Sequence, residues 1–252
     1  MSKSLLDNNY NAAEIEILEG LEPVRHRPGM YIGGIDNNAL HHLAIEIIDN
    51  SMDEVVAKHA TVIDVKLSDD NILTISDNGR GIPIDSHPKF KNKSALEVIM
   101  TTLHSGGKFS NKNYATSGGL HGVGASVVNA LSSFMKVDVI RKGILYTQEF
   151  SKGLPTTKLN KVESTNKITG TSISFKPDTS IFGENNLLNP DKLFKILEYK
   201  AYLFGGVQIN WQCEASLLKG NTITPNTKKF FFINGIIEYI QFKTSTIPMF
   251  TS

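Results

Sequence analysis

The chain has 252 residues, enough for one large domain or two small ones with a sizeable hydrophobic core. It is 40% hydrophobic and 20% charged, as globular proteins usually are, and 26 Lys and Arg against 25 Asp and Glu leave a formal charge of +1. This balance argues against a simple DNA-coating module, and a single cysteine, Cys213, excludes a disulfide within the chain and a metal site built from several cysteines.

The start of the chain and its hydropathy predict a cytoplasmic protein. The first residues, MSKSLLDNNYNAAEIE, lack the apolar centre of a secretory signal. No stretch approaches the roughly 18 apolar residues that a membrane-spanning helix needs. Phe230–Phe242 comes nearest, but Asn234, Gly235 and Glu238 interrupt it, so we expect a strand followed by a helix there.

Hydrophobic periodicity and turn residues predict the elements that follow. In chain order these are a helix at Ala13–Gly20, a turn-rich path over 23–34, a helix at Leu40–His59, strands at Val62–Leu67 and Ile72–Ser76, a turn at 77–83, a helix at Ser94–Leu103, a glycine-bearing polar segment at 104–124, a helix at Ala125–Phe134, strands at Val137–Ile140, Ile144–Phe150 and Thr171–Phe175, and a helix at Asp191–Phe204. Strands and helices interleave without a regular βαβ rhythm, which favours an α+β sandwich with a mixed sheet.

The helix expected at Leu40–His59 would gather polar side chains on one face. At 100° per residue, Glu46, Asn50 and Asp53 fall within about 60° of one another, with Glu54 at the margin. Apolar residues take the other faces, so the helix is largely buried and its carboxylates must face something that offsets their desolvation. A solvated polar stripe is the alternative, but an asparagine among acids is a good ligand for a hard cation.

The second motif is Asp77-Asn78-Gly79-Arg80-Gly81-Ile82-Pro83, directly after a predicted strand. The two glycines around Arg80 permit a tight backbone path and the close approach of a ligand. Asp77, at the strand end, can accept a hydrogen bond from an exocyclic amine. A plain Asn-Gly turn is the alternative for this segment taken alone.

The third motif is Ser117-Gly118-Gly119-Leu120-His121-Gly122-Val123-Gly124-Ala125-Ser126, which opens into a predicted helix and could cradle phosphate with its backbone N–H groups. A dinucleotide fingerprint would need a buried strand in place of the polar stretch Ser110–Ser117, and a P-loop would need Ser or Thr in place of Phe109. Alone the segment could be a structural turn. Together the three motifs supply cation, base and phosphate sites for a nucleotide.

These motifs resemble the ATP-binding boxes of the GHKL superfamily, which contains gyrase, heat-shock chaperone ATPases, histidine kinases and mismatch-repair ATPases. Three further stretches resemble the B subunit of bacterial type IIA topoisomerases: Arg25–Gly33, Asp49–Glu54 and Gly118–Leu131. Two more, Leu21–Val24 and Gly106–Tyr114, resemble topoisomerase IV more than gyrase. A kinase or chaperone ATPase would leave Arg25–Gly33 and the long match around 106–131 unexplained. The resemblance runs from about Tyr10 to the end and implies the Bergerat fold, a mixed sheet with helices on one face.

The resemblance implies a role for each motif. Glu46 would be the general base for the water that attacks the γ-phosphate, and Asn50 would bind Mg²⁺. Asp77 would read the adenine amine, with Thr171 helping through a water. Arg80 would pair with Glu54 at the wall of the adenine pocket.

The remaining implied contacts surround the same nucleotide. Backbone N–H groups from Gly119 to Ala125 would wrap the phosphates, and Lys108 would add positive charge. Tyr10 would reach the nucleotide of the other subunit. For His121, a direct contact and a turn-holding role both stay open. The residues assigned to the nucleotide on this basis, besides those already given, are Asp53, Gly81, Ile82, Pro83, Ile99, Lys108, Gly119, Leu120, His121, Gly122, Val123, Gly124 and Ala125.

The resemblance also implies an architecture and partners. It divides the chain into an arm at 1–18, an ATPase domain at 19–225 and the beginning of a transducer domain at 226–252. ATP and Mg²⁺ are the expected cofactors, and ATP binding would close a homodimer that acts as the entry gate for DNA strand passage. The topoisomerase A subunit and DNA would be partners in the full-length enzyme, and aminocoumarin-type inhibitors would compete with ATP.

Two alternatives remain within this interpretation. Family members continue beyond residue 252 and carry there a transducer lysine that contacts the γ-phosphate, so this chain alone is expected to hydrolyse ATP slowly or not at all. One alternative is therefore a shortened, non-hydrolytic ATP-binding module. The other is the gyrase paralogue, which supercoils DNA.

Overall fold

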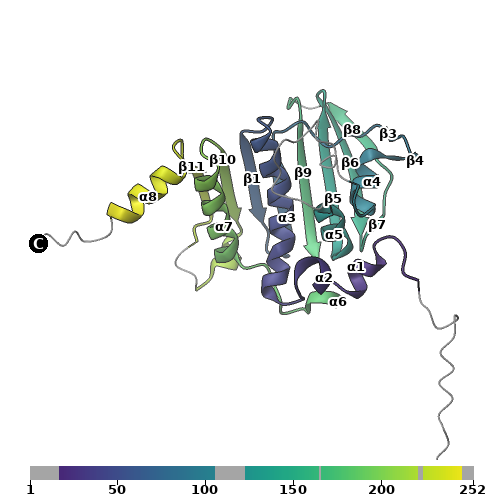
Figure 1. The fold of residues 1–252 in the computed structure, drawn as a ribbon, viewed down its shortest axis with the longest axis horizontal. Helices are drawn as coiled ribbons and strands as arrows, with labels where there is room; N and C mark the ends of the chain where they lie inside the picture. Colours follow the sequence, from purple (N-terminus) through teal and green to yellow (C-terminus); the bar gives the residue numbers. More distant parts are fainter. Residues whose placement is uncertain (1–16, 106–122, 165, 221–223, 246–252) are drawn as a thin grey trace, which may run out of the picture.

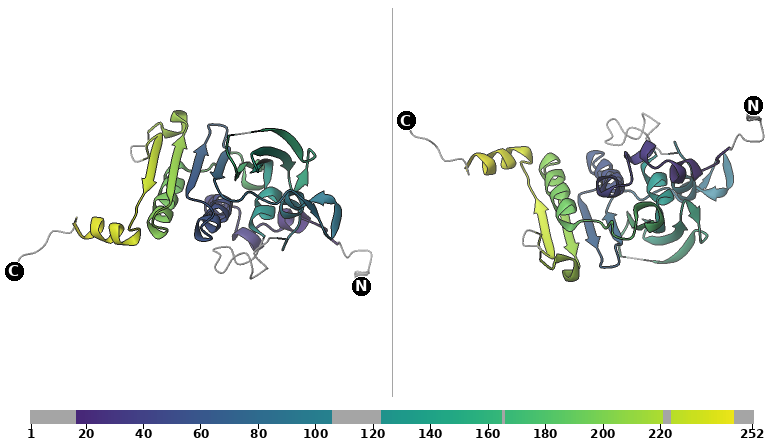
Figure 2. Two further views of the ribbon diagram at one scale, coloured as in Figure 1. Left: turned by 90° about the horizontal axis from the view of Figure 1, so that it is seen from above. Right: turned by 90° about the horizontal axis from the view of Figure 1, so that it is seen from below.

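The computed structural model describes residues 17–105, 123–164, 166–220 and 224–245. A nine-stranded sheet forms one layer, and the main helices cover one of its faces (Figures 1 and 2). The predicted α+β sandwich with helices on one face of a mixed sheet is confirmed. Its strands are β1 (Val62–Leu67), β2 (Leu73–Asp77), β5 (Ser132–Arg141), β6 (Ile144–Ser151), β7 (Leu154–Pro155), β8 (Asn160–Ser164), β9 (Gly170–Pro177), β10 (Gln208–Cys213) and β11 (Thr227–Phe231).

The strands lie in the order β11-β10-β1-β2-β9-β5-β6-β7, and β8 also pairs with β6. The β1–β10 pair is parallel and the other pairs of this sheet are antiparallel. β11 pairs with β10 and so extends the sheet. The family resemblance places the start of a second domain at residue 226, and that boundary stays a prediction. A separate hairpin consists of β3 (Ser86–His87) and β4 (Phe90–Ser94).

The helices differ in length and place. The two long helices are α3, which lies over β2, and α7, which lies over β10 (Figure 1). The helices are α1 (Glu22–His26), α2 (Gly29–Ile32), α3 (Asn37–Val56), α4 (Ala95–Thr101), α5 (Gly124–Ala130), α6 (Thr179–Phe182), α7 (Pro190–Leu203) and α8 (Ile236–Ser245), with a 3-10 turn at Ala215–Leu218. No helix in the described part of the chain is long and apolar enough to cross a membrane.

The core lies between the sheet and these helices. Along β1 the side chains alternate between the buried Ile63, Val65 and Leu67 and the exposed Asp64 and Lys66, as a strand with one covered face requires. From α3, seven apolar side chains are almost fully buried: Ala39, Leu40, Leu43, Ala44, Ile47, Ile48 and Met52. Each large one contributes about 1.5–3 kcal/mol by leaving water, so α3 is fixed firmly over the sheet.

Helix ends show where the sequence prediction was incomplete. The α3 helix starts three residues earlier than predicted because Asp36 caps it, its Oδ1 accepting from the Ala39 N–H at 2.8 Å. The helix predicted to reach Phe134 ends at Ala130, and β5 begins at Ser132. Pairing of β5 with both β6 and β9 overrides the local helical pattern.

The predicted helix at Ala13–Gly20 is tested only in part. Residues 13–16 lie outside the described residues. The residues from Ile17 to Glu19 carry no regular structure, and the first described helix begins at Glu22.

Candidate functional site

The polar face of α3 meets the turn that follows β2. The Ser51 hydroxyl donates to Asp77 Oδ2 at 3.0 Å, and the Gly79 N–H donates to Asp77 Oδ1 at 2.9 Å. Burial raises the pKa of Asp77 from 3.8 to about 6 and outweighs these two hydrogen bonds, which lower it, while the nearby charge of Glu54 raises it further. Asp77 is thus a partly buried carboxylate held in one orientation and still ionised at neutral pH.

The predicted ion pair between Arg80 and Glu54 is confirmed. Arg80 Nη2 donates to Glu54 Oε1 at 2.7 Å, and both its Nε and its backbone N–H donate to Oε2, at 3.1 and 3.0 Å. Because the Glu54 side chain is only 14% exposed, the three bonds tie the turn to α3 in a defined geometry.

Glycines let three backbone segments approach one another at this turn. Gly81 has φ +76°, and a Cβ there would lie 2.8 Å from the carbonyl oxygen of Ile140. Gly170 has φ +155°, and a Cβ there would lie 2.6 Å from the carbonyl oxygen of Asp77. Arg141, at the end of β5, donates from Nη1 to the carbonyl oxygen of Gly81 at 2.8 Å. The turn is therefore packed between β5 and β9 with no room for side chains at these glycines.

The other end of the polar face meets α5. A Cβ on Gly124 would collide with Glu46 Oε2, so the first residue of α5 is in close contact with the Glu46 carboxylate. Asn50 lies one turn further along α3 and is partly buried, and Asp53 is 2% exposed. The structure thus brings Glu46 to the start of α5 and Ser51 and Glu54 to the turn after β2.

The remaining predicted residues have different positions. Thr171 pairs with Asp77 in the β2–β9 register. Ile82 and Ile99 are partly buried and pack against the core, whereas Pro83 is exposed. Val123 and Ala125 flank Gly124 at the start of α5. Outside the described residues lie Tyr10, Lys108, Gly119, Leu120, His121 and Gly122.

The described residues hold no group of three or more His, Cys, Asp or Glu that could bind a metal ion. The amide oxygen of Asn50, together with phosphate oxygens, could hold a cation at this site. That donor set fits Mg²⁺, which binds through one or two protein oxygens, substrate phosphates and water.

Comparison with known proteins identifies the family. The profile described as "Histidine kinase-, DNA gyrase B-, and HSP90-like ATPase" matches residues 35–181, more than half of the chain. The chain belongs to this ATPase family. The match covers α3, the turn after β2, α5 and β9, and so includes every described element of the site.

Relatives within this ATPase family include topoisomerase subunits. The chain is 56% identical over 235 residues to the B subunit of DNA topoisomerase 4 from Bartonella bacilliformis, covering 93% of this chain and 34% of the relative. For the corresponding Rickettsia felis protein the identity is 55% over 239 residues, covering 95% and 36%. The B subunit of DNA gyrase from Thermotoga maritima is 46% identical over 233 residues, covering 92% and 35%. The chain thus spans about a third of the length of these relatives.

A solved structure supports the fold and the family. The 43K ATPase domain of Thermus thermophilus gyrase B, in complex with an aminocoumarin, has a TM-score of 0.77 and 39% identity, covering 92% of this chain and 57% of that one. The predicted likeness to the B subunits of type IIA topoisomerases, and to topoisomerase IV in particular, is confirmed by these relatives.

Two residues of the site were missed from the sequence of this ATPase chain. Ser51 is 4% exposed, and its hydroxyl donates to Asp77. The sequence did not point to it, because a serine beside Asn50 forms no distinctive motif. Gly170 stands alone between polar residues, and only the strand pairing shows that it faces the Asp77 backbone. A glycine immediately before the predicted strand at Thr171 was the available signal.

Proposed function

We propose that this chain binds Mg²⁺-ATP and hydrolyses it as the ATPase part of a type IIA topoisomerase B subunit, of topoisomerase IV rather than gyrase. One observation carries the proposal: the single helix α3 fixes Asp77 through Ser51 and places Glu46 against Gly124. The helix therefore carries both the candidate base, Glu46, and the serine that orients the adenine-reading carboxylate, about one and a half turns apart.

At the adenine end, Asp77 accepts a hydrogen bond from the exocyclic amine. Ser51 and Gly79 orient the carboxylate before the nucleotide arrives, which lowers the entropy cost of binding. Thr171 assists through a water, and Ile82, Pro83 and Ile99 supply apolar contacts to the base. Because the ionised carboxylate is the better acceptor, affinity for adenine rises as the pH rises through about 6.

At the phosphate end, Glu46 accepts a proton from the attacking water. A carboxylate held within hydrogen-bonding reach of the water can serve as the general base. Asn50 offers its amide oxygen to Mg²⁺, and Mg²⁺, when bound, offsets the negative charge of the phosphates. We assign the backbone N–H groups of 119–125, with Lys108 and His121, to the phosphates, and Asp53 to the nucleotide.

The whole-protein functions follow from the relatives. We propose that ATP binding closes a homodimer through the arm that carries Tyr10, and that this closure is the entry gate for DNA strand passage in decatenation and relaxation. The A subunit and DNA are the partners of the longer enzyme, in the cytoplasm. Aminocoumarins compete with ATP here, because the gyrase B domain of similar fold binds one.

Mg²⁺-ATP binding and hydrolysis, measured on the native chain beside Glu46→Ala, test this proposal. Loss of a general base lowers turnover by about 100-fold or more while ATP still binds. Glu184→Ala, which removes an exposed carboxylate after α6, is the matched control and keeps native turnover. If both the native chain and Glu46→Ala bind and neither turns over, the chain is a non-hydrolytic binding module; if neither binds, the site assignment is wrong.

A further inference from the structure

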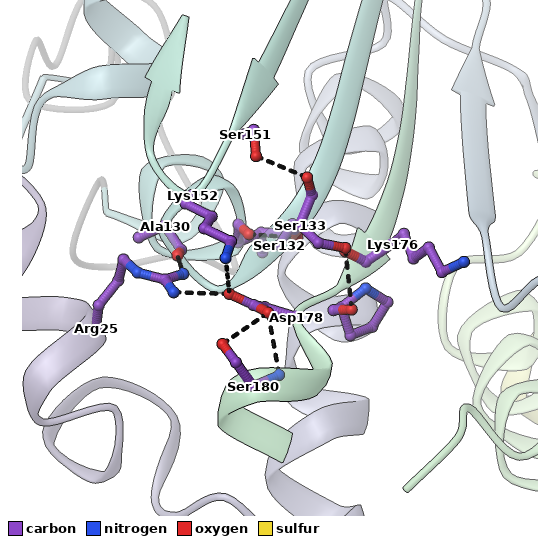
Figure 3. A network of polar contacts seen from close by, with 11 residues as sticks. Arg25, Ala130, Ser132, Ser133, Ser151, Lys152, Lys176, Asp178 and Ser180 are labelled. Carbon is purple, nitrogen blue, oxygen red and sulfur yellow. Dashed lines mark hydrogen bonds and ion pairs between the residues drawn. The ribbon is translucent and has the colours of Figure 1, made fainter. Parts of the chain in front are cut away.

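A polar network lies outside the nucleotide site, where α1 meets the far end of α5 (Figure 3). Arg25, on α1, donates from Nη1 to the carbonyl oxygen of Ala130 and from Nη2 to Asp178 Oδ2, both at 2.6 Å. Ala130 is the last residue of α5. The side chains of Arg25 and Asp178 are 22% and 4% exposed, so this bridge is largely shielded from water.

Asp178 joins several elements at this point. It caps α6, its Oδ1 accepting from the N–H and the hydroxyl of Ser180, and its own N–H donates to the carbonyl oxygen of Leu131 at 2.9 Å. Lys152 Nζ lies 3.7 Å from Oδ2. Burial alone would raise the pKa of Asp178, but the Arg25 and Ser180 bonds outweigh it and hold the pKa below its ordinary value. The carboxylate that anchors Arg25 is therefore ionised at neutral pH.

The α5 helix connects this network to Glu46. It has 7 residues, so it is roughly 10 Å long, and hydrogen bonds at its two ends, Val127 N–H to Val123 and Leu131 N–H to Val127, make it a stiff unit. At its start, Gly124 is in close contact with the Glu46 carboxylate. A displacement of Ala130 along the helix axis would therefore change the spacing between Gly124 and Glu46.

We propose that Arg25 is a positioning residue for the phosphate end of the site, acting through α5 and without touching the nucleotide. A guanidinium at the carboxyl end of a helix also interacts favourably with the helix dipole, which strengthens the anchor. The inference rests on the proposed function, and it predicts that the bridge affects triphosphate binding and leaves adenine binding unchanged.

The double substitution Arg25→Gln with Asp178→Asn tests this, because it removes both charges and leaves no unpaired buried carboxylate. Dissociation constants are measured by calorimetry for a Mg²⁺-loaded, non-hydrolysable ATP analogue and by ligand-observed NMR for adenosine. We expect the analogue to bind about tenfold more weakly, while adenosine keeps its native affinity within about twofold. Equal losses for both ligands, or no loss for either, would overturn the inference.

A matched control and a milder variant complete the experiment. Lys200→Gln with Asp49→Asn removes an ion pair that joins α7 to α3; its cation is 23% exposed, close to Arg25, and its carboxylate is 21% exposed. It is expected to lower stability and leave the ratio of the two affinities unchanged. Arg25→Lys keeps the charge but cannot bridge both acceptors. We therefore expect a smaller loss of affinity for the ATP analogue and, again, no change for adenosine. This variant tests the inference if the double variant does not fold. A native chain that binds neither ligand would contradict the proposed function instead.

Discussion

Burial of the Asp77 carboxylate lowers the stability of the folded chain at neutral pH, but it holds a hydrogen-bond acceptor in a fixed position. Its pKa in the folded chain is about 6, against 3.8 when unperturbed. Between these two values the folded chain binds more protons at Asp77 than the unfolded chain does. The contribution of Asp77 to stability is therefore fully present below about pH 4 and is lost as the pH rises through about 6, by about 3 kcal/mol.

Urea unfolding of the native chain and of Asp77→Asn at several pH values measures the contribution of Asp77 to the free energy of unfolding. We expect the native free energy of unfolding, taken relative to that of the variant, to fall between about pH 4 and pH 7. Asp178→Asn is a control of opposite sign: because the pKa of Asp178 is lowered, the native chain loses stability relative to that variant as the pH falls. Parallel pH curves for the native chain and Asp77→Asn would contradict the prediction.

The residues of the site differ in how far the sequence could reveal them. Glu46, Asp77 and Arg80 stand in motifs whose spacing points to nucleotide chemistry, and the pairing of Arg80 with Glu54 was predicted correctly. The role of Ser51 depends on which face of α3 turns toward β2. The helical periodicity of the sequence does not show which face that is. Arg25 bonds to Asp178, 153 positions away, and only the packing of α1 against α5 brings the two together.

At the scale of elements, a buried histidine connects α3 to α7. His41 is 3% exposed, its Nδ1 donates to the carbonyl oxygen of Asn37 at 2.6 Å, and its Nε2 accepts from the Asn189 N–H at 2.9 Å. Burial lowers the pKa of His41, the Asn37 bond opposes this, and the charges of Lys192 and His42 lower it further. The neutral ring is therefore the form that joins the cap of α7 to α3.

Acidification should weaken this connection. Because the pKa of His41 is lowered in the folded chain, the unfolded chain binds more protons below about pH 6.5, and stability from this residue is lost as the pH falls from there. We expect the free energy of unfolding of the native chain, measured in urea relative to that of His41→Gln, to fall between about pH 7 and pH 5. Amide hydrogen exchange in the first turn of α7 should become faster over the same range. His59→Gln, at an exposed position just after α3, is the control and should follow the native curve. A native curve parallel to that of His41→Gln would show that the ring does not hold α7.

Elements were predictable where local pattern and tertiary packing agree. The strands at 62–67 and 144–151 have clear alternation or β-branched content, and the structure keeps them within a residue of the prediction. The β3–β4 hairpin was missed because Phe90–Ser94 is polar and mostly exposed, so it carries no apolar alternation. The break between α5 and β5 depends on strands far away in sequence, which a local pattern does not contain.

At the scale of the whole molecule, the two edges of the sheet differ. The edge at β7 and β8 is short, whereas beyond β11 the helix α8 extends away from the sheet (Figure 1). Four of its apolar side chains are exposed, Ile236 by 47%, Ile237 by 56%, Ile240 by 54% and Phe242 by 58%. At 100° per residue, Ile236, Ile237 and Ile240 fall within about 100° of one another, and an exposed apolar face of this kind promotes association between molecules.

Self-association through α8 should therefore be removable without loss of the nucleotide site. We expect sedimentation velocity of the native chain to show an apparent mass that rises with concentration, and the double substitution Ile237→Lys with Ile240→Lys to abolish that rise. Leu154→Lys with Val162→Lys adds the same charge at exposed positions on the opposite edge and should leave the association unchanged. ATP-analogue affinity should be native in both variants, because α8 lies at the β11 end of the sheet, away from α3 and the turn after β2. A native chain that stays monomeric at every concentration would show that the exposed face of α8 is too small to drive association by itself.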